Sequence, residues 1–127
     1  MELNHNCIRS VLLKLESYPY NYQCTMKQLS SDLPDYENED IQYCVSKLHE
    51  IGYIDANVVH VDGSVPLVTS IYDITFAGHE FLNSIREPEL WKKTKSVASK
   101  IGATSISALT QISSGVITAL IKSTLGI

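Results

Sequence analysis

The first half of the chain carries apolar residues that recur at intervals of three and four positions. This spacing predicts three short helices, over residues 4–17, 25–33 and 38–51. Their apolar positions are Ile8, Val11, Leu12, Leu15, Met26, Leu29, Leu33, Ile41, Cys44, Val45, Leu48 and Ile51. The residues suited to cap or end these helices are Asn4 or Asn6, Thr25 and Gly52.

After the third helix the pattern changes to runs of β-branched residues. Residues 53–61 and 65–74 predict two antiparallel strands, and Asp62-Gly63 between them is a strong hairpin signal. The predicted fold class is therefore mainly α with a small antiparallel β-hairpin. Three helices followed by a hairpin is the order of a winged helix-turn-helix domain, with the hairpin as its wing.

A helix signal returns directly after the hairpin. Thr75 can cap this helix, which ends near Arg86, and Pro88 suits the first turn of a fifth helix. We expect a winged-helix domain over residues 1–86 and a helical tail over residues 87–127. The structural joint between them is predicted to consist of Thr75, Gly78, His79, Phe81 and Trp91, with Phe76 adding a further apolar position.

The tail contains a long segment without charge, because no residue between Ile101 and Ile121 is Asp, Glu, Lys or Arg. An apolar stripe at helical spacing faces a side rich in Ser and Thr, and small residues permit close helix packing. Such a stripe must be buried, which predicts a homo-oligomer, most simply a dimer. The predicted interface consists of Ile106, Leu109, Ile112, Val116, Leu120 and Ile121.

Charge is distributed unevenly along the 127 residues, whose formal net charge is −4. The start of the third helix is acidic, and the start of the tail is basic. An acidic surface repels nucleic acid and suits a basic protein partner. The predicted acidic interaction face is Asp35, Glu37, Glu39 and Asp40, and the basic cluster is Lys92, Lys93, Lys95 and Lys100.

No residue pattern points to catalysis or to a cofactor. His79-Glu80 lacks the second histidine that a zincin helix requires four residues later, where Asn83 stands. Phosphate-binding glycine loops and a nucleophile elbow are also missing. We therefore expect a protein that is not an enzyme and that uses no metal or cofactor.

Cysteine usage and the N-terminus predict a cytoplasmic protein. The three cysteines, Cys7, Cys24 and Cys44, form no closely spaced pair and are expected to be free, buried thiols. Residues 1–6 are polar and lack the apolar core of a signal peptide.

The segment Gly78-His79-Glu80-Phe81-Leu82, followed by Trp91-Lys92-Lys93, resembles a family of small phage and prophage proteins classified as a domain of unknown function. The opening residues 4–9 and Gly52-Tyr53-Ile54 are similar to that family as well. The resemblance implies a winged-helix-like front and a phage-associated setting, so the expected location is the cytoplasm of a bacterial host. It implies no activity.

Three functions remain open from the sequence. The favoured one is a protein-interaction module that self-associates through its tail and binds a host or phage protein, in regulation or counter-defence. The first alternative is a DNA-binding regulator that uses the winged helix and the basic cluster. The second is an effector that attaches to membranes through residues 101–127, although Gln111 makes this segment polar for a membrane span.

Overall fold

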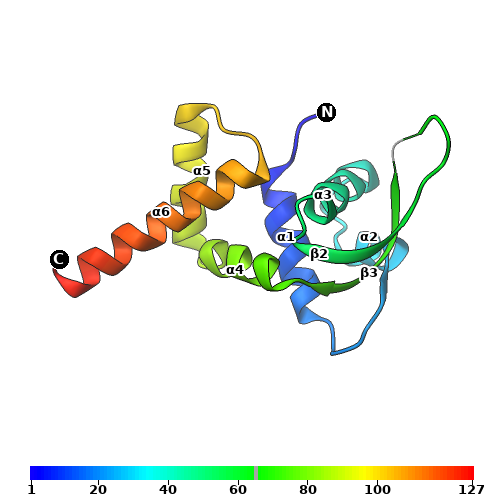
Figure 1. Cartoon of the computed structure of the whole chain (residues 1–127), viewed down its shortest axis with the longest axis horizontal. Helices are drawn as coiled ribbons and strands as arrows, with labels where there is room; N and C mark the ends of the chain where they lie inside the picture. Colours follow the sequence, from blue (N-terminus) through cyan, green and yellow to red (C-terminus); the bar gives the residue numbers. More distant parts are fainter. Residues whose placement is uncertain (65) are drawn as a thin grey trace.

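The computed structural model describes residues 1–64 and 66–127 and shows an α+β fold (Figure 1). Six helices accompany a small three-stranded antiparallel sheet in these residues, which confirms the predicted class. In chain order the elements are α1 (His5–Ser17), β1 (Cys24–Thr25), α2 (Met26–Asp32), α3 (Asn38–Glu50), β2 (Ile54–Val59), β3 (Leu67–Ile74), α4 (Phe76–Ile85), α5 (Pro88–Ile101) and α6 (Ile106–Leu125).

The helices begin where local side chains satisfy the free backbone N–H groups of the first turn. Asn4 Oδ1 accepts from Cys7 N at 3.1 Å, and Thr25 Oγ1 accepts from Gln28 N at the same distance. Thr25 was predicted as a cap and is confirmed, and of the two candidates Asn4 and Asn6 the structure shows Asn4 as the cap. Capping depends on residues within one turn, so it can be recognised without knowledge of the tertiary fold.

The sheet contains one strand that the sequence pattern did not reveal. Its order is β1-β3-β2, and all neighbours are antiparallel. The hairpin of β2 and β3 was predicted, although Val65 lies outside the described residues. The additional strand, β1, has two residues and pairs Cys24 with Ile71. Two residues are too few to show the alternation by which strands are recognised.

One hydrophobic core runs from α1 to the first turns of α6. It is formed by α1, α2, α3 and the inner face of the sheet, and it continues through α4 to Trp91 and Ala98 of α5. Ile106 and Leu109 of α6 complete it. This core crosses the predicted domain boundary at residue 86, so α5 and the start of α6 pack as part of the same body.

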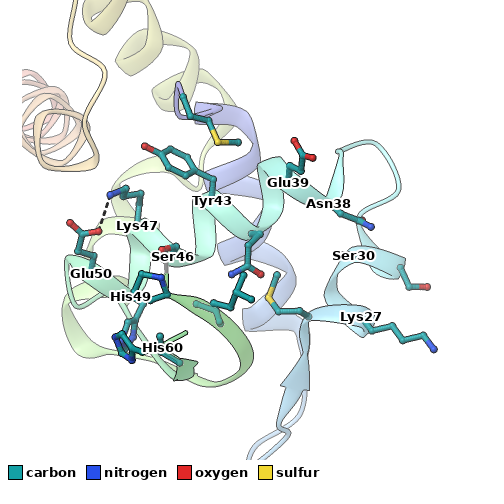
Figure 2. Close-up of a pocket in the computed structure, with 18 residues that line it drawn as sticks. Lys27, Ser30, Asn38, Glu39, Tyr43, Ser46, Lys47, His49, Glu50 and His60 are labelled. Carbon is teal, nitrogen blue, oxygen red and sulfur yellow. Dashed lines mark hydrogen bonds and ion pairs between the residues drawn. The ribbon is translucent and has the colours of Figure 1, made fainter. Parts of the chain in front are cut away.

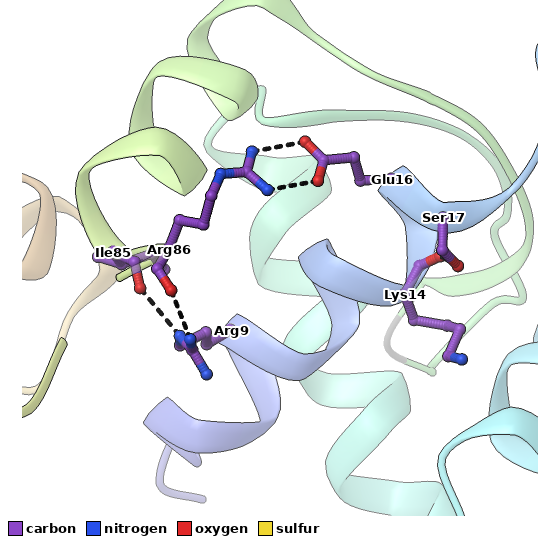
Figure 3. Close-up of polar contacts among 6 residues, drawn as sticks. All are labelled: Arg9, Lys14, Glu16, Ser17, Ile85 and Arg86. Carbon is purple, nitrogen blue, oxygen red and sulfur yellow. Dashed lines mark hydrogen bonds and ion pairs between the residues drawn. The ribbon is translucent and has the colours of Figure 1, made fainter. Parts of the chain in front are cut away.

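The end of α4 is held by side chains of α1 (Figure 3). Arg9 donates from Nε to the carbonyl oxygen of Ile85 at 2.9 Å and from Nη2 to that of Arg86 at 2.6 Å. Arg86 in turn pairs with Glu16, with 2.6 Å between Nη2 and Oε2. The last carbonyl groups of a helix have no partner within the helix, so these contacts satisfy them and orient α4 against α1.

Candidate interaction surfaces

The contact between the start of α4 and the turn after α3 depends on a close approach of two backbones. Thr75 caps α4 by accepting from Gly78 N at 3.1 Å, and its hydroxyl donates to the carbonyl oxygen of Gly52 at 2.6 Å. A Cβ atom on Gly78 would lie 2.0 Å from the carbonyl oxygen of Tyr53. Glycine is therefore the residue that allows α4 to pack this tightly. The predicted role of Thr75 as the cap of this helix is confirmed.

Two other residues of the predicted joint point into solvent. Phe76 is 81% exposed, and His79 is exposed as well. Within the part of the chain that the structure describes, the His79 ring makes no hydrogen bond to the hairpin or to α5. Phe76, expected to add an apolar position to the joint, does not do so, because α4 buries the side that carries Gly78, Phe81 and Leu82 and Phe76 lies on another side.

Trp91 anchors α5 to the body, as predicted. Its side chain is 5% exposed, and its Nε1 donates to Asn6 Oδ1 at 3.1 Å. Lys95 Nζ donates to the same oxygen at 2.9 Å and lies 5.5 Å from the centre of the indole ring. The polar partner of Trp91 thus comes from α1, a contact across 85 residues that no local pattern could indicate.

The basic cluster is confined to α5 and is not continuous with α3. Lys92, Lys93 and Lys100 are exposed, whereas Lys95 is half-buried by its contacts with Asn6 and Trp91. α5 and α3 lie in different parts of the molecule (Figure 1). The cluster and the third helix therefore do not form one positively charged surface.

The first half of α6 belongs to the body. Ile106 is 4% exposed, and both Leu109 and Ser113 are fully buried. Two hydroxyl pairs fasten this half to its neighbours: Tyr53 Oη with Thr110 Oγ1 at 2.8 Å, and Ser84 Oγ with Ser113 Oγ at 2.7 Å.

Two residues of the predicted oligomer interface, Ile106 and Leu109, are therefore core residues of their own chain. They were assigned to an interface because their spacing is helical, and that spacing does not show which surface covers them. Ile112 is likewise packed in part against the same core.

The second half of α6 extends away from the body (Figure 1). Leu120, Ile121 and Leu125 are 49%, 52% and 66% exposed, and Val116 is half-buried. A Cβ atom on Gly115 would meet open space. We call residues 114–127 the distal tail. Of the predicted interface, Val116, Leu120 and Ile121 lie within it and are accessible to a partner.

The predicted acidic face surrounds the start of α3. Asp35, Glu37 and Glu39 are exposed, and Asp40 is half-buried. The helix dipole favours Glu39 and Asp40 in this first turn, so these carboxylates also have a structural role. Farther along α3, Lys47 pairs with Glu50 at 2.9 Å, and this contact raises the pKa of Lys47.

A groove beside α3 was not anticipated from the sequence (Figure 2). It has a volume of about 1360 Å³ and lies between α2, α3 and the β2–β3 hairpin. Its apolar lining comes from Met1, Met26, Val58, Pro66, Leu67 and Val68. These residues are far apart in the sequence, so only the fold reveals that they share one surface. We call it the α3–hairpin groove.

Gln42, on the groove side of α3, is turned toward the sheet. In the amide orientation that satisfies both groups of Val68, the side-chain oxygen accepts from Val68 N at 2.8 Å and the nitrogen donates to the Val68 carbonyl at 3.3 Å. These bonds cover the backbone of β3 beyond the end of the short strand β1. Glutamine can recognise adenine in DNA, but the Gln42 amide is already hydrogen-bonded within the protein.

The titratable groups of the core suit a structural role. Cys7, Cys24 and Cys44 are free and buried, as predicted. The hydrogen bond with Cys7 and burial together raise the pKa of Cys44, which keeps this thiol protonated. Across residues 1–64 and 66–127, the structure brings together no group of three His, Cys, Asp or Glu side chains suited to a metal.

In the same residues, every helix is too short or too polar to cross a lipid bilayer.

Sequence comparison identifies the family of this chain. Residues 2–105 match the family model described as "Hypothetical protein (DUF2513)". The chain belongs to this family. It is also 29% identical, over 126 aligned residues, to an uncharacterized protein of Haemophilus influenzae, and the alignment covers 95% of this chain and 99% of the relative. The family match ends at residue 105, so it includes α1 to α5 and stops just before α6 begins.

Proposed function

We propose that this chain is a non-enzymatic protein-interaction module of the winged-helix type, which self-associates through its distal tail. The phage or prophage setting, which the family resemblance implies, and a role in regulation or counter-defence are part of this proposal. The observation that carries it is the distal tail itself. Exposed apolar side chains are clustered on one protruding helix, and monomeric proteins rarely leave such a cluster uncovered.

The winged-helix assignment is supported by the element order. α2 and α3 are joined by a short turn, as in a helix-turn-helix, and the β2–β3 hairpin follows directly. β1 precedes α2 and pairs with β3, so the strand before the helix-turn-helix joins the sheet of the hairpin. α3 then occupies the position of a recognition helix.

The chemistry of α3 favours a protein partner over DNA. Helices that read DNA usually present Arg, Lys, Asn or Gln to the bases and phosphates. Here the start of α3 presents Glu37 and Glu39, Gln42 is bonded to β3, and Lys47 is paired with Glu50. The acidic face would repel a phosphate backbone and attract a basic protein surface.

Light scattering tests self-association directly. The full-length protein at micromolar concentration should be a dimer or larger, and the double variant Leu120→Asp/Ile121→Asp should be monomeric and still folded by circular dichroism. Ala119→Asp, an exposed change on the side of the helix away from Leu120, Ile121 and Leu125, is the matched control and should retain the assembly. A wild-type protein that scatters as a monomer would overturn the proposal.

A binding titration with duplex DNA at physiological salt tests the competing DNA-binding regulator. We expect binding weaker than the roughly micromolar non-specific affinity typical of basic proteins. A nanomolar complex with one specific sequence would replace the protein-interaction proposal by the regulator. Binding to phospholipid vesicles that requires Leu120 and Ile121 would instead favour the membrane-associated effector.

A further inference from the structure

A second, smaller pocket lies between the end of α1, the loop that follows it, β3 and the start of α4. Its volume is about 320 Å³, at the lower end of the range for ligand pockets, so it has room for one side chain and not for a helix. Four tyrosines line it: Tyr18, Tyr20, Tyr22 and Tyr72. We call it the tyrosine pocket.

The loop that carries three of these tyrosines is held in place by its own contacts. Tyr18 Oη donates to Asp32 Oδ2 at 2.6 Å, and the rings of Tyr18 and Tyr22 pack with 4.9 Å between their centres. The backbone N–H of Tyr22 donates to the carbonyl oxygen of Pro19 at 3.1 Å and closes the turn. Rings that are already fixed lose little conformational freedom when a ligand binds, so the pocket is suited to binding as it stands.

The rings of this pocket lack the cation that covers aromatic rings elsewhere in the chain. Lys95 Nζ lies 5.5 Å from the centre of the Trp91 ring, and a lysine lies over Tyr43 at the same distance. Tyr22 and Tyr72 are 38% and 45% exposed, and across residues 1–64 and 66–127 no lysine or arginine lies over either ring. Because the face of an aromatic ring is partially negative, these two open faces attract a cation from outside.

Carboxylates give the same part of the surface a net negative charge. Asp73 lines the pocket and lies directly opposite Asp55 of β2, and neither forms an ion pair with a residue that the structure describes. Like charges opposite each other in a sheet are destabilising, and a cation beside them offsets the repulsion. Glu16 also lines the pocket, but Arg86 already matches its charge (Figure 3). His79, the one basic residue of the described lining, cannot balance both aspartates even when it is protonated.

Exposed aromatic side chains around the pocket favour a protein as the source of this cation. Tyr20, at the pocket, is 97% exposed. Phe76 is 81% exposed and precedes the pocket residue His79 by three positions, so the two lie on the same side of α4. Tyrosine, phenylalanine and arginine are all enriched where proteins contact one another.

We propose that the tyrosine pocket binds an arginine side chain of a protein partner. The planar guanidinium packs on the open faces of Tyr22 and Tyr72 and donates to the carboxylate of Asp73, a combination of contacts for which arginine is better suited than lysine. This inference rests on the proposed protein-interaction role and names the chemistry of one contact with the partner. It does not involve the distal tail.

A titration with two matched peptides tests this assignment on the full-length protein. Both peptides are short, with acetylated and amidated ends; one has a central arginine and the other has citrulline, its neutral isostere. NMR spectra of the backbone amides measure affinity and location together. The arginine peptide should shift signals of residues 18–22 and 72–74. The citrulline peptide should bind about tenfold more weakly, because it loses both the ion pair and the cation–π contact.

Two variants test the assigned contacts, and a third is their control. Asp73→Asn removes the charge and keeps an oxygen that accepts from Ile74 N, a bond of 2.9 Å in the wild type. Tyr22→Leu removes one ring and keeps an apolar side chain. Each should weaken the arginine peptide by about threefold or more. Glu2→Gln, an exposed change before α1 with the same loss of charge, should bind like the wild type. Circular dichroism shows whether each variant is folded.

The possible outcomes separate this inference from the proposed self-association. Equal binding of the two peptides, no saturation up to about 10 mM, where a millimolar complex is mostly formed, or full affinity in both folded pocket variants overturns the arginine site. Shifts confined to residues 35–40 overturn it as well and assign the cation to the acidic face. The variant Leu120→Asp/Ile121→Asp should bind the arginine peptide unchanged. A wild type that is monomeric in light scattering yet binds the peptide in the pocket overturns self-association alone.

Discussion

The two halves of α6 have similar sequences and different surroundings. Both are rich in Ile, Leu, Ser and Thr, and no charge interrupts them before Lys122. In the first half, the hydroxyl groups of Thr110 and Ser113 bond to side chains of other elements. In the distal tail, the hydroxyl of Thr118 bonds only to its own helix, at the carbonyl of Ser114.

The difference arises from the lengths of the helices. α6 has 20 residues and spans about 30 Å, whereas α5 and α4, against which it packs, have 14 and 10 residues and span about 21 and 15 Å. The second half of α6 therefore continues beyond the surface that covers the first half. An apolar stripe in a sequence shows that burial is required, and the length of the neighbouring element determines how much of it the same chain supplies.

Trp91 gives the largest expected effect, because it tests how far the body extends past residue 86. Replacement of this buried aromatic side chain by alanine should lower the free energy of unfolding by about 3–5 kcal/mol. Urea denaturation at low protein concentration measures it. A silent change would mean that α5 is not part of the body, and the contrast within α6 would then lose its basis.

Leu109 and Leu120 form the matched pair that tests the comparison itself. Leu109→Ala removes a fully buried side chain and should cost about 2–5 kcal/mol of stability. Leu120→Ala changes a half-exposed side chain and should alter monomer stability by no more than about 0.5 kcal/mol. Both are measured by urea denaturation below the concentration of self-association. Equal effects would contradict the division of α6.

The hydroxyl contacts give a smaller effect that sharpens the same division. Tyr53→Phe removes the partner of Thr110 and should cost about 0.5–1.5 kcal/mol, the usual net value of one hydrogen bond. Thr118→Val in the distal tail is the control and should leave monomer stability nearly unchanged. Thermal melts of the two variants measure both costs. The division of α6 requires that Tyr53→Phe lowers stability more than Thr118→Val does.

The smallest expected effect depends on pH. It concerns the contact between α1 and the end of α4, in which α6 takes no part. The hydrogen bond from Arg86 lowers the pKa of Glu16, so this pair stabilises the fold above the ordinary carboxyl pKa and loses its effect as pH falls through the lowered value. Glu16→Gln should cost about 0.2–1 kcal/mol near neutral pH, because the pair is exposed. Unfolding measured from neutral to acidic pH should show this cost disappear.

The penalty of Leu109→Ala serves as the pH control. No titratable acidic or basic side chain lies between Ile101 and Ile121, so this penalty should stay constant over the same pH range. A Glu16→Gln difference that persists at strongly acidic pH would show that the residue acts by packing and not by its charge.

Local signals in the sequence predicted most of the helices and one hairpin. Asn4, Thr25 and Thr75 act as caps, and the apolar spacing located α1, α3 and α4, because these features depend on neighbours within a few residues. The same signals failed for β1, which is too short to show a pattern, and for Phe76, whose apolar side chain is turned outward by the orientation of α4.

The sequence by itself determined that α6 is an amphipathic helix without charge before Lys122 and that its apolar stripe needs a cover. Only the tertiary structure decided that Ile106 and Leu109 are covered within the chain while Leu120 and Ile121 are not. It also assembled the α3–hairpin groove from segments distant in the sequence. The reason is physical: periodicity records the side of a helix that avoids water, and contact depends on where other elements begin and end in space.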